Sequence, residues 1–571
     1  MNSKQRWRTR LALGGVIAVA CVLAASLYST AVIHGDSYAA KAQAQYARPA
    51  TNIFDRGTIY FSSFSGKSGT ETAAATLGSG YLIYMNPKLV HDPSGTYEAL
   101  SHYIKLDRAS FLAKAGKAND PYEELARRIE EAPALSISAL GLAGVGVARE
   151  TWRSYPSDGL AAHEIGIIGQ NAASTTVSGR YGLERSYDAV LNRPPVGMAS
   201  NAFAELFSGL AGGDDGERGD IVTTLEPTVE RYLEKVLADT SDAWHPNEIG
   251  GVIIDPMTGE IAAMSSLPTF DPNNTSATKK VSTFSNPLVE HVYEMGSIMK
   301  PLTMSVALDT GAETPSSTYD DTGCMTLNTK KICNYDGKAR GIIPMQEILS
   351  QSLNIGAATI ALRTGAAAFA DYFYRFGLGD KSGIDLPSEG VPLVKNLRSP
   401  SDIDIATASY GQGFAVSPIG MTRALSIIAN GGYVIQPHLV KEIRHMDGTT
   451  EAIKPMKAGP VLKPQTVEDV RKMLVKVVDT KLANGTLKKE HYSIAAKTGT
   501  AMIADPVNGG YYKDRYLHSF FGFFPVSAPR FLVFLYQVEP KGAQYASETL
   551  AKPFDSLATF LLNYYSIAPD R

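Results

Sequence analysis

Cysteine is scarce in this sequence, with three residues among 571. So low a content excludes a disulfide scaffold and a structural zinc site, because both need clustered cysteines. Cys21 lies in an apolar N-terminal segment, whereas Cys324 and Cys333 flank a short run that is typical of a β-hairpin. Any structural role of Cys324 and Cys333 is therefore confined to one hairpin.

The chain also lacks an excess of charge of either sign, since its formal net charge is −3 at pH 7. Nucleic-acid-binding proteins usually present a basic surface, so we expect no nucleic-acid partner. Hydrophobic residues make up 44% of the chain, which is enough for substantial cores. The length corresponds to about three or four units of ordinary size.

We find one apolar run that is long enough to cross a bilayer. Residues 11–33 contain no charged residue and would span a hydrocarbon core of roughly 30 Å as a helix. Basic residues precede the run, so residues 1–10 should stay in the cytoplasm and the remainder should be exported. The small residues at 24–26 leave a cleaved signal peptide as the alternative. We expect an uncleaved anchor, because the run continues past those residues.

A stretch rich in glycine and aspartate at residues 212–219 indicates a domain boundary. Before it, the charged residues 121–129 suggest a polar helix. After it, a helix is expected over 227–239, followed by a buried hairpin over 250–264. A hairpin that leads into helices indicates a mixed fold in which a sheet and helices pack together.

A serine and a lysine stand three residues apart where an apolar helix should begin. Residues i and i+3 share one face of a helix, so Ser297 and Lys300 would point to the same spot, as a nucleophile beside a base. Pro301 has no N–H to donate, so the first turn should be irregular or tightened. Ser276 and Lys279 share the spacing but lie in a stretch without apolar periodicity, and we do not expect them to react.

Two further polar segments follow along the chain. Ser352 and Asn354 interrupt two helical patterns and should lie on a loop. The other segment follows an apolar, strand-like run and consists of Lys497, Thr498, Gly499 and Thr500. Taken singly, either segment could be an ordinary loop or strand end.

These three motifs contain no histidine, and the chain has no G-x-S-x-G elbow. Both absences argue against a Ser-His-Asp hydrolase and leave Lys300 as the base. A free amine has a pKa of about 10.4, so Lys300 must be desolvated or pushed by a second cation to be neutral. Lys497 could supply that push if its strand lies against the helix.

The order S-x-x-K, S-x-N, K-T-G resembles that of the penicillin-interacting transpeptidases and serine β-lactamases. Flanking patterns narrow the resemblance to class B penicillin-binding proteins and extend it over nearly the whole chain after the anchor. They lie at residues 153–156, 161–163, 182–184, 187–188, 255–261, 410–413 and 497–501. The sequence departs from the family at Met295, where a proline is usual, and in the shortened pattern at 55–57. Neither change removes a chemical group from the proposed site.

The resemblance implies an α/β (α+β) fold with a single N-terminal transmembrane helix. It implies an elongated, mixed pedestal (dimerisation-like) domain over 34–219. It also implies a penicillin-binding transpeptidase domain over 220–571, with a central antiparallel sheet flanked by helices. The protein would be held in the bacterial cytoplasmic membrane by one span, with the bulk of the chain outside the cytoplasm.

The implied activity is that of a serine D,D-transpeptidase of cell wall synthesis, which cross-links peptidoglycan stem peptides ending in D-Ala-D-Ala and is inhibited by β-lactams. Ser297 would form the acyl-enzyme, Ser352 would relay a proton to the leaving amine, and Asn354 would hold the peptide amide. The substrate's terminal carboxylate and the oxyanion would be bound by the last motif, through Lys497, Thr498, Gly499 and Thr500, together with the Ser297 N–H.

Alternatives with the same residues are a D,D-carboxypeptidase or a β-lactam-sensing hydrolase, in which water resolves the acyl-enzyme. A third is a mainly structural scaffold of the division machinery. Length and the pedestal patterns favour division over elongation. We expect a polytopic glycosyltransferase and other divisome or elongasome proteins as partners, and neither a metal nor a cofactor.

Cys324 and Cys333 should form a disulfide. Export would place them where thiols can be oxidised, and hairpin spacing can bring their Cα atoms within the roughly 4.4–6.8 Å that the bond requires. The bond would make the region between the nucleophile helix and the Ser352 loop more rigid. Two free, buried thiols are the alternative.

Overall fold

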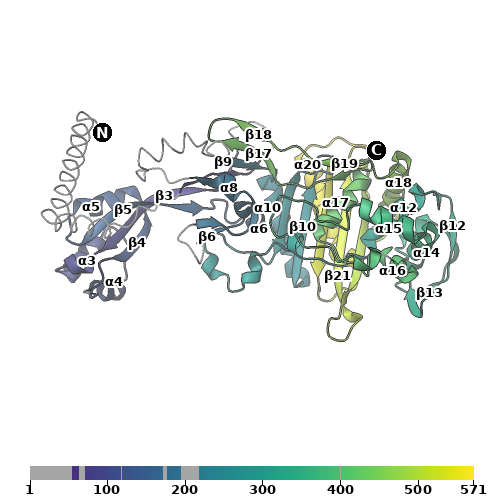
Figure 1. Cartoon of the computed structure of the whole chain (residues 1–571), viewed down its shortest axis with the longest axis horizontal. Coiled ribbons are helices and arrows are strands. Elements are labelled where there is room, and N and C mark those ends of the chain that lie inside the picture. The colour runs from purple at the N-terminus through teal and green to yellow at the C-terminus, as the bar shows by residue number, and fades with distance from the viewer. Residues whose placement is uncertain (1–54, 63–70, 118, 171–176, 194–217, 399) are drawn as a thin grey trace, which may run out of the picture. The chain divides into compact units, whose positions relative to one another are not determined.

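The computed structural model describes residues 55–62, 71–117, 119–170, 177–193, 218–398 and 400–571 (Figure 1). The chain divides into two compact units. Of the described residues, the first unit holds Asp55 and Leu77–Trp152, and the second holds the rest. Residues expected to form one domain over 34–219 therefore contribute to both units.

The expected anchor at residues 11–33 lies outside the described residues. Within the described ranges, no helix is both long enough and apolar enough to cross a membrane.

The first unit packs short helices against a small sheet. Strand β3 (Ala73–Met85), which begins in the second unit, pairs antiparallel with β4 (Glu123–Ile129) and also pairs with β5 (Val145–Ser154). The helices are α3 (Pro93–Ser101), α4 (Arg108–Ala115) and α5 (Glu131–Ala139). Their shared core includes Ile83, Leu100, Phe111 and Ile137.

The helix that we expected over residues 121–129 is wrong, because Glu123–Ile129 is strand β4. Its charged residues suit a helix, but pairing with β3 satisfies the backbone and lets Leu125 and Ile129 pack against the core. Tertiary pairing outweighs local preference in this segment.

The second unit is built on a five-stranded sheet in the order β11-β10-β22-β21-β20, with antiparallel neighbours throughout. Its strands are β10 (Glu248–Ile254), β11 (Ile261–Leu267), β20 (Ala495–Ala504), β21 (Tyr511–Phe524) and β22 (Phe531–Val538). This sheet confirms the expected hairpin over 250–264 and the strand-like setting of Lys497. It also leaves β20 as an outer strand of this sheet.

The two faces of this sheet carry different helices, because side chains alternate along β21. Phe520 stacks on Phe554 of α20 (Ala551–Tyr564), with ring centroids 4.6 Å apart. Its neighbour Ser519 points the other way and donates to the Met295 carbonyl, 2.8 Å away. The nucleophile segment therefore lies on the face opposite α20.

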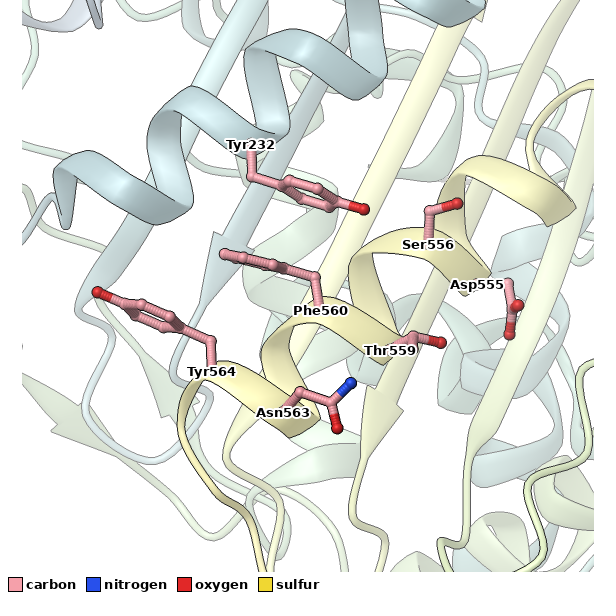
Figure 2. Close-up of a pocket in the computed structure, with 7 residues that line it drawn as sticks. All are labelled: Tyr232, Asp555, Ser556, Thr559, Phe560, Asn563 and Tyr564. Carbon is pink, nitrogen blue, oxygen red and sulfur yellow. The ribbon is translucent and has the colours of Figure 1, made fainter.

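Helix α10 (Pro227–Trp244), which confirms the helix expected over 227–239, packs beside α20. A pocket of about 680 Å³ lies at these two helices. Figure 2 shows the side chains that line it, among them Tyr232 of α10, which stacks on Phe560 of α20. None of the residues of the three motifs lines this pocket.

Helix α12 (Lys300–Asp309) follows directly on the segment that contains Ser297 and is buried along nearly its whole length. The unit's other helices of at least five residues are α7 (Gly182–Ser186), α13 (Gln346–Ser350), α14 (Asn354–Thr364), α15 (Ala366–Arg375), α16 (Asp402–Ala408), α17 (Pro418–Ala429) and α18 (Pro464–Thr480). Side chains from sheet and helices form one continuous core. The structure confirms a mixed fold with several sheets and helices.

A second sheet of this unit runs β18 (Thr450–Ala452), β17 (Val440–His445), β9 (Gly219–Thr223) and β2 (Ile59–Tyr60), which pairs with the start of β3. Beside it, Glu184 is fully buried and accepts from Arg56 and Arg153, at 2.6 Å each. Asp188 accepts from the other side of Arg56 at 2.7 Å. Three of the flanking sequence patterns, together with the shortened pattern at 55–57, thus meet in one ion cluster.

Candidate active site

Two glycines allow the nucleophile segment to lie directly against β20. Gly296 has a φ of +66°, and a Cβ there would come within 2.8 Å of the Thr500 carbonyl oxygen. A Cβ on Gly499 would come within 2.6 Å of the Met295 carbonyl oxygen. Only residues without side chains fit at this contact, which brings Ser297 beside the strand that carries Lys497.

The turn that holds the nucleophile is tightened, as the sequence predicted. Ser297 lies in a 3₁₀ segment over Gly296–Met299, and the α-helix starts only at Lys300. Pro301 occupies the first turn of that helix, where its missing N–H costs nothing. Ser297 is partly buried and its hydroxyl faces the Lys300 amine.

Lys300 is fully buried and its amine touches four oxygens. Nζ lies 3.0 Å from Ser297 Oγ, 2.6 Å from the Ser352 carbonyl, 3.2 Å from Ser352 Oγ and 2.8 Å from Asn354 Oδ1. A neutral amine has two hydrogens for the two shortest contacts and a lone pair that can accept the Ser297 proton. The geometry therefore suits a base.

Burial lowers the pKa of Lys300 well below its ordinary value, and repulsion by Lys497 lowers it further. Burial also lowers the pKa of Lys497 to about 7. Both conditions that the sequence placed on a neutral Lys300, desolvation and a second cation, are met in the structure.

Ser352 lies between the two amines. Its Oγ is 3.2 Å from the Lys300 amine and accepts from the Lys497 amine at 3.0 Å. Its φ of +58° is in the left-handed region, which non-glycine residues adopt mainly where the surroundings fix them. Ser352 lies on a loop as expected, between α13 and α14.

Asn354 differs slightly from the expectation, because it is the first residue of α14 and not part of the loop. Its Oδ1 accepts from Lys300, and its Nδ2 donates to the Cys333 carbonyl at 3.1 Å. The amide is thus held between the base and the neighbouring hairpin.

The last motif lies on β20, where Lys497 is 2% exposed and donates to the Thr498 carbonyl as well as to Ser352. Thr500 Oγ1 accepts from the Ala546 N–H at 3.1 Å, which leaves its hydroxyl hydrogen free to donate. Thr498 and Thr500 are partly exposed at the site.

Ser276, which we did not expect to react, has no lysine amine among its hydrogen-bond partners in the described residues. It is exposed in a short 3₁₀ turn, and its hydroxyl donates to Asn274 Oδ1.

The structure contains the predicted disulfide between Cys324 and Cys333. The two residues face each other across the hairpin of β13 (Cys324–Leu327) and β14 (Lys330–Cys333), with Cα atoms 4.1 Å apart. The separation is slightly shorter than the range we expected.

Sequence reasoning missed several groups around the site. The Cys333 carbonyl and the Ala546 N–H are backbone atoms, which no residue type reveals. Tyr335 and Tyr545, with ring centroids 6.0 Å apart, follow the hairpin and precede Ala546, and both are exposed. The sequence carries no signal for these groups, because neither tyrosine stands in or beside one of the three motifs.

A serine activated by a lysine, without histidine, is the chemistry of the penicillin-interacting serine enzymes. Comparison with known sequences agrees with that class. The model of the penicillin binding protein transpeptidase domain matches residues 249–557, and the chain belongs to this family.

Relatives match most of the chain. Stage V sporulation protein D of Bacillus subtilis is 28% identical over 493 residues, which are 84% of this chain and 74% of that protein. Peptidoglycan D,D-transpeptidase FtsI of Escherichia coli is 26% identical over 578 residues, which are 99% of this chain and 93% of that protein.

Solved structures are similar as well. Penicillin binding protein 3 from Mycobacterium tuberculosis, complexed with aztreonam, has a TM-score of 0.66 at 25% identity. The match covers 74% of this chain and 92% of that chain. Penicillin Binding Protein 2X from Streptococcus thermophilus has a TM-score of 0.73 at 20% identity, and the match covers 90% of this chain and 79% of that chain. At this identity, the match shows a similar fold.

The lowered pKa values predict how acylation of Ser297 depends on pH. The rate should fall as pH drops through the pKa of Lys300, because a protonated amine cannot accept the serine proton. Lys497 is charged below about pH 7 and opposes that protonation. Lys497→Met should therefore move the acidic limb to higher pH, by about one unit.

The measurement is the rate of acylation by a β-lactam across the pH range. Lys235→Met, which removes an exposed lysine of α10, is the control and should leave the limb in place. A limb that stays fixed or moves to lower pH in Lys497→Met would contradict the assigned coupling.

Proposed function

We propose that this chain is a serine D,D-transpeptidase that cross-links peptidoglycan stem peptides and that β-lactams acylate. The observation that carries the proposal is the buried Lys300 amine, 3.0 Å from Ser297 Oγ in a chain of the transpeptidase family. A relative named peptidoglycan D,D-transpeptidase, which aligns with 99% of the chain, supports it.

Acylation begins when Lys300 accepts the Ser297 proton and Oγ attacks the carbonyl between the two terminal D-alanines. Backbone N–H groups of Ser297 and Thr500 stabilise the oxyanion. The C–N bond then breaks, the last D-alanine leaves with a proton relayed through Ser352, and an ester on Ser297 remains. The contact of 3.2 Å between Lys300 Nζ and Ser352 Oγ supports this relay.

An amine of a neighbouring stem peptide then attacks the ester. It loses a proton as the new amide forms, and Ser297 regains its hydroxyl hydrogen through Lys300. This second step is the reverse of acylation in its bonds and proton transfers, except that a different amine takes the place of the D-alanine that left.

Substrate contacts are assigned to the remaining motif residues. Thr498 and Thr500 hydroxyls and the charge of Lys497 suit the terminal carboxylate, with Gly499 giving the backbone room to approach. The Asn354 amide has one N–H bonded to Cys333, and its second N–H can hold the carbonyl of the donor peptide.

We assign the enzyme to division rather than elongation, in line with its length and the pedestal patterns. We further propose the pedestal over 34–219, the transpeptidase domain over 220–571 and a membrane anchor at 11–33. A polytopic glycosyltransferase and other wall-synthesis proteins would be its partners.

Exposure of the full chain to penicillin should add the mass of one molecule, and Ser297→Ala should abolish the gain because the ester oxygen is lost. Intact mass spectrometry measures this directly. Ser276→Ala is the matched control and should label like the natural chain.

Lys300→Ala should be acylated about 10²–10⁴-fold more slowly, the usual contribution of a general base. Labelling that survives in Ser297→Ala would refute the nucleophile, and near-normal labelling in Lys300→Ala would refute the base.

Transpeptidation and carboxypeptidase activity differ in what resolves the acyl-enzyme. With a peptide ending in D-Ala-D-Ala, added acceptor amine should raise the ratio of transferred to hydrolysed product, because the amine competes with water for one ester. Chromatography of the products measures the ratio, with Ser297→Ala as the blank. A product mixture that contains only the hydrolysed peptide at every amine concentration would indicate a carboxypeptidase, and acylation without turnover would favour a sensor or scaffold.

If residues 11–33 are an anchor, the mature protein should begin near Met1 and stay with membranes after a high-salt wash, because about twenty apolar residues hold a helix in the bilayer. N-terminal sequencing of the membrane fraction checks this. A soluble form that begins near residue 26 would show a cleaved signal peptide instead.

A further inference from the structure

The disulfide-bonded hairpin touches the active site through a backbone atom. The Cys333 carbonyl accepts from Asn354 Nδ2 at 3.1 Å, and Oδ1 of the same amide accepts from the Lys300 amine at 2.8 Å. A short path therefore joins the Cys324–Cys333 bond to the base.

The direction of these bonds fixes the orientation of the amide. A carbonyl can only accept a hydrogen bond, so the NH₂ end of Asn354 must face Cys333. The oxygen end then faces Lys300. If the amide turned over, its NH₂ would meet the donor hydrogens of Lys300, and the base would lose one of its two shortest contacts.

The residue after Cys333 attaches the hairpin to the same helix end. Asn334 Oδ1 accepts from the Ile355 N–H at 3.1 Å, and Asn334 Nδ2 donates to the buried carboxylate of Asp321 at 2.8 Å. Residues 333 and 334 therefore both hydrogen-bond to the first turn of α14.

Besides the disulfide, the hairpin is held by modest contacts: Met325 and Leu327 pack, partly buried, against the core, and the Asn334 N–H donates to the Gly323 carbonyl at 2.9 Å. Its two strands of four residues pair only with each other, and a two-stranded hairpin is marginal in water. Of its strand residues, Ile332 alone is buried. The covalent bond at the open end of the hairpin acts directly on Cys333 and so constrains where its carbonyl lies, in addition to the bonds of Asn334.

We propose that the Cys324–Cys333 disulfide is a positioning element of the active site, which fixes the Cys333 carbonyl and thereby the orientation of Asn354 toward Lys300. The inference rests on the proposed function and deepens it, since it concerns acylation at the same serine. Under this proposal, loss of the disulfide lowers the rate of acylation and has little effect on the free energy of unfolding of the whole protein.

A double-mutant cycle on the full-length protein tests this. Cys324→Ala/Cys333→Ala should slow acylation by a β-lactam about tenfold, within the range for coupled neighbours. In an Asn354→Ala background the same change should have less than a twofold effect, because the route through the amide is already gone. Lys331→Ala, on the exposed face of the hairpin, is the matched control and should leave the rate unchanged.

A second measurement uses the natural chain. A dithiol reductant gives two electrons and two protons to the cysteine sulfurs and becomes a disulfide itself, so the bond opens without mutation. The acylation rate should fall about tenfold and return on reoxidation, while the melting temperature of the protein changes little.

Equal losses in both Asn354 backgrounds would overturn the proposal and show a general structural effect, and so would an unchanged rate after bond loss. Either result would leave the proposed function standing, whereas failure of the natural, oxidised chain to acylate at Ser297 would refute the function itself.

Discussion

The active site depends on the burial of one amine. In water, the Lys300 amine would be charged at neutral pH and could not accept the Ser297 proton. Complete burial removes that hydration, and Lys497 adds a repulsion that falls away as its own pKa, about 7, is passed. Oxygens from Ser352 and Asn354 then satisfy the hydrogens of the neutral amine. Without this enclosure the serine would remain a weak nucleophile.

The fold creates the enclosure by bringing three separate segments onto one buried helix end. Gly296 and Gly499 let the nucleophile segment lie on the outer strand β20, and the loop before α14 closes over Lys300 with Ser352 in a left-handed conformation. The core of the sheet and the helices behind it hold these segments in place. Packing energy from a large core thus offsets the cost of keeping two lysines out of water.

The side chains that meet at the candidate site were predictable from the sequence, because they belong to short motifs whose spacing is local. The pair Ser297 and Lys300, the tightened turn at Pro301 and the hairpin of Cys324 all follow from near neighbours. The strand over 121–129 was not predictable, because its partner β3 lies some forty residues earlier and pairing overrides its helical composition. The Cys333 carbonyl was equally hidden, since every residue has one and only the fold selects which is used.

In the proposed mechanism the two lysines have different tasks, because the Lys300 amine contacts the Ser297 hydroxyl and the Lys497 amine donates to the Ser352 hydroxyl. Lys300 reaches Ser297 at 3.0 Å, whereas Lys497 contacts Ser352 and lies on the strand. Since Lys497 donates to Ser352 Oγ, the hydroxyl hydrogen of that serine points away from Lys497 and can be donated to another group. In the proposed mechanism, a proton taken by Lys300 passes across 3.2 Å to Ser352 and on to the leaving amine. Ser352 adopts its left-handed backbone at the point where its hydroxyl oxygen lies between both amines, which is the position that the proposed relay requires.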